Sequence, residues 1–250
     1  MDKRVVLVTG SSKGIGEGIA KRFALEGWHS VVSYYRDKPG GERVVNDIVA
    51  TGGSASLVNL DVQSEQSVQA VLEEIGSELG RLDALVSSAV REIPKPVEDA
   101  TLDEWHTVLL TKLDGAFLTT KYSIPLLSKA ENASIVYITS GDGVRPNGEY
   151  LGYQIGTAGL IAMTKANAVH LAKKYQIRVN AVSPGPVRTP LWEALGGKDE
   201  SMWEGFNESA PIGRIATTDD VAAACLYLAA DERQILNGVF LNVDGGSQWT

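Results

Sequence analysis

The segment TGSSKGIG, residues 9–16, has the composition of a phosphate-binding turn. It follows the apolar run 5–9, which predicts a buried strand, and it precedes apolar residues at helical spacing over 15–24. Glycines permit a tight turn and close backbone approach, and the free N–H groups at a helix N-terminus attract a pyrophosphate. In this strand, turn and helix context we predict that the segment binds a dinucleotide. The residues expected at the phosphates are Gly10, Ser12, Lys13, Gly14, Ile15 and Gly16.

Two cations are placed to select the form of the dinucleotide. Arg36 follows a second apolar run, 30–34, and Lys13 lies in the glycine-rich turn. In NAD-binding proteins an acidic residue at the end of the second strand binds the ribose 2′-hydroxyl, whereas a 2′-phosphate requires cations. The sequence therefore predicts NADPH rather than NADH. The alternative is that Lys13 is solvated and that Arg36 pairs with Asp37.

Apolar runs and helical periodicities alternate along the rest of the chain, a pattern typical of a doubly wound α/β fold. Predicted strands occupy residues 5–9, 30–34, 55–58, 84–86, 135–138, 179–182 and 239–243. Predicted helices occupy residues 15–24, 43–50, 68–79, 102–127, 160–175 and 221–229. Together they predict one Rossmann-type domain over residues 1–250, with a parallel sheet of seven strands.

Helix ends and one irregular segment add detail to this fold. Thr101 and Glu104 predict a capping box for the long central helix, and Thr218 is expected to open the late helix in the same way. Residues 186–211 carry apolar side chains among glycines and charges, which is the composition of a lid over a site.

The composition excludes several functional classes. A formal net charge of -8 argues against nucleic acid or an anionic membrane as a partner. No apolar stretch is long enough to span a membrane and the N-terminus lacks a signal-peptide pattern, so we expect a cytoplasmic protein. The single cysteine, Cys225, excludes an intrachain disulfide and is expected to be buried. His29, His106 and His170 lack the spacing of metal ligands, and no metal site is predicted.

Several spaced motifs extend over essentially the whole chain. The glycines of residues 10–16 follow the pattern Gly-x-x-x-Gly-x-Gly. Asp61 and Val62 follow the third predicted strand, the run VNAVSPG occupies residues 179–185, and DGG occupies residues 244–246. In this order and spacing the chain resembles the short-chain dehydrogenase/reductase family.

The resemblance implies a set of cofactor contacts and an assembly. The Asp61 and Val62 pair would contact the adenine, and the turn after residues 179–182 would lie beside the nicotinamide. The family usually pairs its long central helices and its C-terminal strands across twofold axes, so we expect a homo-oligomer, in particular a homotetramer. The further cofactor-binding residues that the resemblance implies are Asp61, Val62, Ser88, Ala89, Tyr153, Thr157, Pro184, Gly185, Val187 and Thr189.

The catalytic tetrad that the family usually has, Asn-Ser-Tyr-Lys, is altered in this chain. Alignment with the family places Ser140 and Tyr153 at the serine and tyrosine positions. Thr157 stands at the lysine position, Lys112 at the asparagine position, and Val90 where the family has glycine. The Ser140 hydroxyl can hold a carbonyl oxygen and the neutral phenol of Tyr153 can donate a proton to it. Reduction should therefore suffer less from the missing lysine than alcohol oxidation, which needs the phenolate.

The missing lysine leaves alternatives open. Positions 112 and 157 are neighbours in the family, so Lys112 is one candidate to supply the lost cation. The other interpretation is that Lys112 is solvated and that the site has lost its function. Tyr150 stands seven residues before Thr157, the spacing seen in the related enoyl-carrier reductases, and is a second candidate acid.

Three functions remain in view. We predict an NADPH-dependent reductase of a ketone or 3-oxoacyl-type carbonyl, small or carrier-bound, with Ser140, Tyr153 and Lys112 as the catalytic residues. The alternatives are an enoyl reductase that uses Tyr150 and a non-redox or impaired homologue that binds NADPH. The fold alone does not choose among them, because function belongs to the site.

Overall fold

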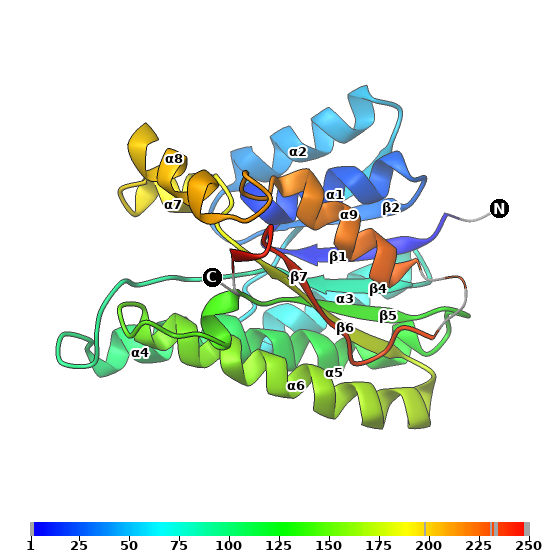
Figure 1. Ribbon diagram of the computed structural model, residues 1–250. Helices are drawn as coiled ribbons and strands as arrows, with labels where there is room; N and C mark the ends of the chain where they lie inside the picture. The colour runs from blue at the N-terminus through cyan, green and yellow to red at the C-terminus, as the bar shows by residue number, and fades with distance from the viewer. Residues whose placement is uncertain (1–2, 198, 231, 233–234, 248–250) are drawn as a thin grey trace.

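The computed structural model describes residues 3–197, 199–230, 232 and 235–247. Its centre is a parallel sheet of seven strands in the order β3-β2-β1-β4-β5-β6-β7, the doubly wound arrangement that the sequence predicts (Figure 1). The strands are β1 (Val5–Thr9), β2 (His29–Tyr34), β3 (Ser54–Asn59), β4 (Ala84–Ser87), β5 (Ser134–Ile138), β6 (Arg178–Pro184) and β7 (Phe240–Val243).

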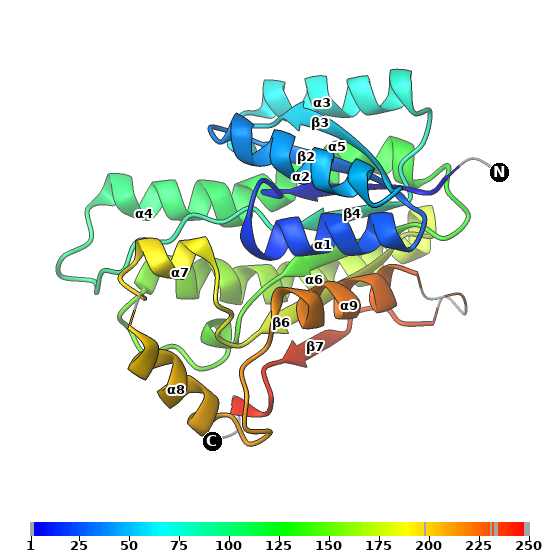
Figure 2. The same cartoon turned by 90° about the horizontal axis from the view of Figure 1, so that it is seen from above.

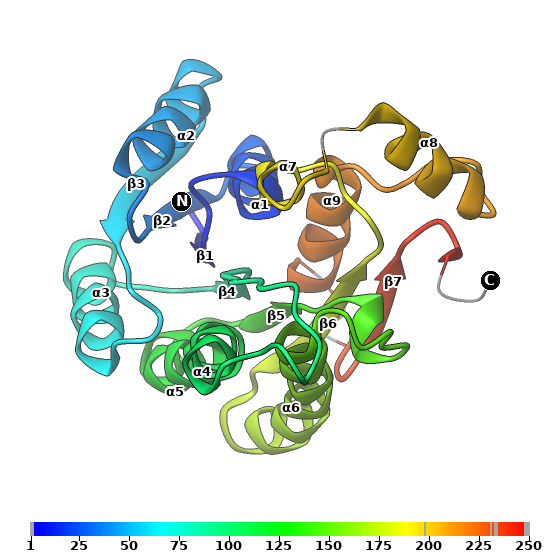
Figure 3. The same ribbon diagram turned by 90° about the vertical axis from the view of Figure 1, so that its left-hand side faces the viewer.

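Helices cover both faces of the sheet. Helices α1, α2 and α9 lie on one face, and α3, α4, α5 and α6 lie on the other (Figure 1 and Figure 3). Strand β1 is buried throughout, and its alternate side chains join two different apolar clusters, one under each layer. The covering helices are α1 (Gly14–Leu25), α2 (Lys38–Ala50), α3 (Glu65–Glu78), α4 (Leu102–Leu109), α5 (Gly115–Leu127), α6 (Leu151–Tyr175) and α9 (Thr218–Ala229).

Side-chain caps define where two of these helices begin. Thr101 and Glu104 form the predicted capping box at the start of α4. The expectation that Thr218 caps α9 is wrong, because the cap is Thr217, whose Oγ1 accepts from Asp220 N at 3.2 Å. Asp220 stands at the third helical position only when Thr217 is the cap, and its carboxylate accepts a hydrogen bond from the Thr217 N–H at 2.8 Å. Cys225 is fully buried on α9, as predicted.

The central helix differs from the continuous helix predicted over 102–127. Its regular pitch is interrupted by η1 (Leu110–Asp114), a π-helical turn between α4 and α5. The wider π turn shifts the direction of the side chains that follow it, and such turns occur frequently at functional sites. Lys112 lies in the middle of this turn. None of the helices in the described part of the chain combines the length and apolarity needed to cross a membrane.

Segment 186–211 forms two short helices, α7 (Pro190–Ala194) and α8 (Glu200–Ser209), beyond the carboxyl ends of the strands (Figure 2). Residue 198 of this segment lies outside the described residues. Trp203 is buried and its Nε1 donates to the Gly197 carbonyl at 3.1 Å. Its ring centroid lies 5.9 Å from that of Trp192 and 5.8 Å from that of Phe206. These aromatic contacts give the two helices a small apolar core of their own.

A buried cation joins the sheet to the end of α9. Arg178, at the start of β6, is 5% exposed. Its guanidinium donates to the carbonyls of Leu228 at 2.7 Å and Ala229 at 3.0 Å, which are the last residues of α9. Carbonyls at a helix C-terminus lack intrahelical partners and carry the negative end of the helix dipole, so a cation there stabilises the helix end.

Replacing this cation should destabilise the fold. We expect Arg178→Met to lower the free energy of unfolding by about 3 kcal/mol, because buried carbonyls lose their donors. Equilibrium urea unfolding followed by circular dichroism measures the change. Lys129→Met, at an exposed position, is the control and should stay within about 0.5 kcal/mol. A loss below about 1 kcal/mol for Arg178→Met would show that water satisfies these carbonyls.

Candidate active site

A cavity of about 1110 Å³ opens at the carboxyl ends of the strands. The loops after β1, β2, β3, β4, β5 and β6 line it, together with residues of η1, α6, α7 and α8. The carboxyl ends of parallel strands are the usual place for a ligand in an open α/β sheet. The predicted cofactor and catalytic residues all line this cavity except Thr157, which is fully buried behind its wall.

The glycine-rich turn between β1 and α1 has the close approach that the sequence predicts. Gly10 and Gly14 have φ angles of +67° and +62°, which favour glycine. A Cβ added at Gly16 would lie 2.5 Å from the Gly10 carbonyl oxygen, so only glycine fits there. Helix α1 has no side-chain cap at Lys13, and its first N–H groups are therefore available to an anion at the cavity.

A network of serines fixes this turn to the second strand. The Ser11 hydroxyl donates to the Val8 carbonyl at 2.7 Å and accepts from the Ser33 N–H at 2.8 Å. Gly10 N donates in turn to the Ser33 hydroxyl at 3.0 Å. Ser11 and Ser33 are both buried, so these hydrogen bonds are protected from water. The end of β2, which leads to Arg36, is thereby held beside the glycine-rich turn.

Arg36 and Lys13 are exposed at the rim of the cavity. The Arg36 guanidinium lies 5.0 Å from the centroid of the Tyr35 ring. Asp37 caps α2 by accepting from Gly40 N at 3.1 Å and does not pair with Arg36, so the predicted alternative of that ion pair is wrong. Among the described residues neither Arg36 nor Lys13 has a carboxylate partner, and both cations are available to a ligand.

The loops after β3 and β4 complete the predicted cofactor wall. Asp61 and Val62 line the cavity, and the Asp61 carboxylate also accepts from Gln63 N at 3.0 Å. Ser88 and Ala89 each donate their N–H to the Thr9 hydroxyl at 3.0 Å, which ties the end of β4 to the end of β1. A Cβ at Gly10 would lie 2.8 Å from Ala89 Cα, so the two loops are in direct contact. The other predicted residues on this wall are Pro184, Gly185, Val187 and Thr189.

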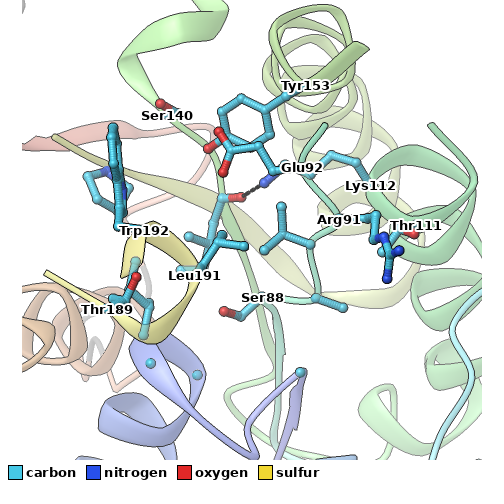
Figure 4. A pocket seen from close by; sticks show the side chains of 18 of the residues that line it. Ser88, Arg91, Glu92, Thr111, Lys112, Ser140, Tyr153, Thr189, Leu191 and Trp192 are labelled. Carbon is cyan, nitrogen blue, oxygen red and sulfur yellow. Dashed lines mark hydrogen bonds between the residues drawn. The ribbon is translucent and has the colours of Figure 1, made fainter. Parts of the chain in front are cut away.

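Ser140, Tyr153 and Lys112 meet in the cavity from three different elements (Figure 4). Ser140 follows the end of β5, Tyr153 lies in the first turn of α6, and Lys112 comes from η1. Lys112 is only 4% exposed, so the interpretation of a solvated lysine is wrong. Its Nζ donates to the Ile138 carbonyl at 2.9 Å and lies 5.2 Å from the centroid of the Tyr153 ring.

Glycines on α6 allow η1 to pack closely against it. A Cβ added at Gly156 would lie 3.2 Å from Lys112 Cγ, and one added at Gly159 would lie 3.0 Å from Leu113 Cδ1. Both distances are shorter than ordinary van der Waals contact between carbons. The absence of these side chains therefore lets Lys112 reach the wall of the cavity beside Tyr153.

Burial controls the ionisation of the Tyr153 phenol and the Lys112 ammonium. Burial, and then the charge of Glu92, raise the pKa of Tyr153, while the nearby hydroxyls of Ser140 and Thr157 lower it. The phenol therefore stays protonated at neutral pH. Burial lowers the pKa of Lys112 to about 8, although the charge of Glu92 raises it. Thr157 Oγ1 is buried and lacks a hydrogen-bond partner of good geometry.

The sequence did not identify Glu92, which the structure places in this cluster (Figure 4). Glu92 lies in the loop after β4, which has no periodicity and no motif. The one sequence signal for it is that a carboxylate stands shortly after the end of a strand. Burial raises the pKa of Glu92 to about 7, against the charge of Lys112, which lowers it, while Asp142 raises it further. Asp142 also lines the cavity, and burial raises its pKa.

The second candidate acid and the apolar wall complete the cavity. Tyr150 is the residue before α6 and also lines the cavity, and burial raises its pKa. Trp192, Leu191 and Phe206 line it from α7 and α8. Figure 4 shows Trp192 and Leu191 on the side opposite Lys112.

Comparison with known proteins identifies the family. A family model described as enoyl-(acyl carrier protein) reductase matches residues 10–248. The chain is 32% identical over 244 residues to 3beta-hydroxysteroid dehydrogenase 1 of Eggerthella lenta, covering 97% of this chain and 93% of that protein. It is 33% identical over 245 residues to the NADP-dependent (R)-specific alcohol dehydrogenase of Lentilactobacillus kefiri, covering 97% and 96% of the two chains.

A solved structure agrees with these relatives. The 3-ketoacyl-(acyl-carrier-protein) reductase of Brucella melitensis, complexed with NADH, matches with a TM-score of 0.88 and 33% identity over 98% of each chain. The chain therefore belongs to the short-chain dehydrogenase/reductase family, which confirms the motif resemblance. Its relatives are oxidoreductases with different substrates. The alcohol dehydrogenase is NADP-dependent, and the Brucella reductase was solved with NADH.

Proposed function

We propose that this protein is an NADPH-dependent reductase of a ketone or 3-oxoacyl-type carbonyl. The observation that carries the proposal is the meeting of Ser140, Tyr153 and Lys112 in the same cavity as the glycine-rich turn. The Ser140 hydroxyl holds the carbonyl oxygen, and the Tyr153 phenol gives that oxygen a proton as charge develops on it. Because the pKa of Tyr153 is raised, the phenol is in its donating form at neutral pH. Reduction is therefore the favoured direction.

The glycine-rich turn fits the phosphates of a dinucleotide. Its N–H groups at the uncapped start of α1 face the cavity, and a side chain at Gly16 would fill the cradle. Arg36 and Lys13, which have no described carboxylate partner, are the cations that would hold a 2′-phosphate. The buried Thr157 hydroxyl has no hydrogen-bond partner of good geometry among the described residues. It could donate to or accept from a cofactor, although Thr157 does not line the cavity. A bound nicotinamide supplies the hydride.

Lys112 supplies the positive charge that a lysine at position 157 would otherwise supply. Its burial and its position 5.2 Å from the Tyr153 ring centroid support this relocation. An ammonium this close to the phenol stabilises the phenolate that remains after proton transfer. Lys112 thus acts in the second half of the reaction.

The apolar wall suggests what the substrate looks like and how it is enclosed. Trp192, Leu191 and Phe206 face the cavity from α7 and α8, so the substrate carries an apolar body next to its carbonyl. We propose that segment 186–211 acts as a lid over it. An enoyl reductase using Tyr150 is the second candidate, because Tyr150 lines the same cavity and the matching family model carries that description. The buried Lys112 argues against a non-redox homologue.

The protein is proposed to be a homo-oligomer, in particular a homotetramer. Leu110 and Phe117 are 38% and 52% exposed on the outer side of η1 and α5. Apolar side chains exposed along the central helix support its pairing with a second copy.

A substrate panel tests the proposed reaction. We expect NADPH oxidation with ketones, and alcohols as products, by absorbance at the cofactor band and mass spectrometry. Tyr153→Phe should lower turnover by about a hundredfold or more, since the proton donor is lost. Tyr150→Phe is the matched comparison and should lower it much less. Products that keep the carbonyl and lose a C=C bond, with dependence on Tyr150, would instead establish the enoyl reductase.

Cofactor preference depends on Arg36. Arg36→Asp should weaken NADPH binding by about tenfold or more, which is about 1.4 kcal/mol, and leave NADH binding unchanged or stronger. Fluorescence titration of the purified protein with each cofactor measures both affinities. Lys38→Asp removes a neighbouring exposed cation outside the cavity and is the control. Equal NADPH and NADH affinities in the wild type would refute the preference.

The relocated cation has its own set of variants. Lys112→Met should lower turnover by about a hundredfold with a smaller effect on NADPH affinity. Thr157→Lys alone should not raise turnover, because two ammonium groups in one pocket repel each other. Lys112→Asn combined with Thr157→Lys should exceed the Lys112→Met variant. Steady-state kinetics decides this, and unchanged turnover in Lys112→Met would rule the relocation out.

A further inference from the structure

The Glu92 carboxyl group is a titratable group without a hydrogen-bonding partner. It is partly buried and lines the cavity, yet within the described part of the chain it forms no hydrogen bond and no ion pair. The charge of Lys112 acts on Glu92, and the Lys112 ammonium donates to the neutral carbonyl of Ile138 at 2.9 Å. Buried charges in proteins are normally paired or hydrogen-bonded. Two titratable groups that act on each other's ionisation in one cavity therefore point to a shared role.

The side chains around Glu92 come from three elements. Figure 4 shows Glu92, Lys112 and Tyr153 gathered on the same side of the cavity. Lys112 comes from η1, Asp142 from η2 (Gly141–Gly143), and the tyrosines from the start of α6. The charged and titratable groups that line this part of the cavity are Arg91, Glu92, Lys112, Asp142, Arg145, Glu149, Tyr150 and Tyr153. Of the cations among them, Lys112 is buried, whereas Arg91 and Arg145 are exposed.

We propose that Glu92 is the counter-ion and proton donor of Lys112, and that the two side chains return a proton to Tyr153 after each turnover. This inference rests on the proposed carbonyl reduction. It adds a relay residue to a site in which Thr157 stands at the lysine position of the family tetrad.

The proton transfers balance in three steps. When hydride has reached the carbonyl carbon, the carbonyl oxygen takes the phenolic proton, the O–H bond of Tyr153 breaks, and a phenolate remains. The phenolate takes a proton from the Lys112 ammonium, which becomes a neutral amine. The amine takes a proton from the Glu92 carboxylic acid through water that enters the open cavity, and the resulting carboxylate takes a proton from hydronium or a buffer acid in the solvent. No oxidant or reductant is needed in these steps.

The order of the groups makes each transfer favourable. A proton passes readily from the acid of lower pKa to the base whose conjugate acid has the higher pKa. Burial raises the pKa of Glu92 to about 7 and lowers the pKa of Lys112 to about 8, and burial also raises the pKa of Tyr153 above its usual range. The chain Glu92, Lys112, Tyr153 is therefore ascending. Because Glu92 and Lys112 carry protons at low pH and lose them at high pH, relay-dependent turnover should fall as the pH rises through 7 to 8.

Titration of the cofactor-free protein tests the coupling without using activity. The Lys112 resonance is assigned by its loss in Lys112→Met and followed with pH by NMR of the lysine side chains. We expect Glu92→Gln to move the Lys112 titration midpoint to lower pH by about one unit, because the stabilising anion is removed. Glu149→Gln, which removes another carboxylate from the cavity wall, should leave the midpoint in place. An unchanged midpoint in folded Glu92→Gln overturns the proposal.

Kinetics tests the proton return. Glu92→Gln should lower kcat by about tenfold with little change in KM, move the fall of kcat with pH to lower pH, and recover when imidazole is added as an external proton donor. A packing defect would not respond to imidazole. If the wild type reduces ketones and Glu92→Gln keeps its kcat and pH profile, the relay is wrong while the proposed function stands. If the wild type reduces no carbonyl, the proposed function and the proton return both fail.

Discussion

All seven strands run in the same direction, and the meeting of the loops that carry much of the site follows from that constraint. Parallel strands require crossover helices, and these bring the carboxyl end of each strand to one edge of the sheet. The glycine-rich turn, the Arg36 loop, the Glu92 loop and Ser140 follow β1, β2, β4 and β5. Side chains that are far apart in the sequence therefore share one cavity. The serine network between β1 and β2, and the Thr9 contacts to the loop after β4, then set the distances between neighbouring loops.

The chemistry of the cavity is governed by how the structure tolerates a buried ammonium. Removing Lys112 from water is unfavourable, and one carbonyl at 2.9 Å compensates only part of the lost hydration. The remainder appears as a pKa near 8 and as an electrostatic dependence on Glu92. A surface lysine would hold its proton firmly at neutral pH, whereas this one is close to releasing it. The same burial that makes the group unfavourable in the fold makes it useful in proton transfer.

The sequence predicts the parts of this protein that depend on regular patterns. The strands, their parallel arrangement, the Thr101 capping box and the glycine-rich turn all carry a periodicity or a motif, and the structure has them. The π turn at Leu110–Asp114 is invisible in the sequence, because the apolar spacing continues through it and only tertiary packing against α6 selects the wider turn. The sequence leaves Lys112 either in the site or solvated, since lysine usually extends its ammonium to water, and only the structure shows that it is buried. Glu92 lies in an irregular loop, where its position depends on contacts with other loops.

The separation of the proposed catalytic cation from the proposed catalytic acid has a mechanical consequence. When a tyrosine and a lysine stand one turn apart on a single helix, backbone geometry fixes their spacing. Here Tyr153 belongs to α6 and Lys112 to η1, so their spacing is set by the contact of two separate bodies at Gly156 and Gly159. A displacement of a few tenths of an ångström between those bodies changes the electrostatic environment of the phenol without altering either residue. The pKa of the Tyr153 phenol thus depends on how η1 packs against α6. A contact on the outer surface of the central helix that shifts η1 would therefore change this pKa.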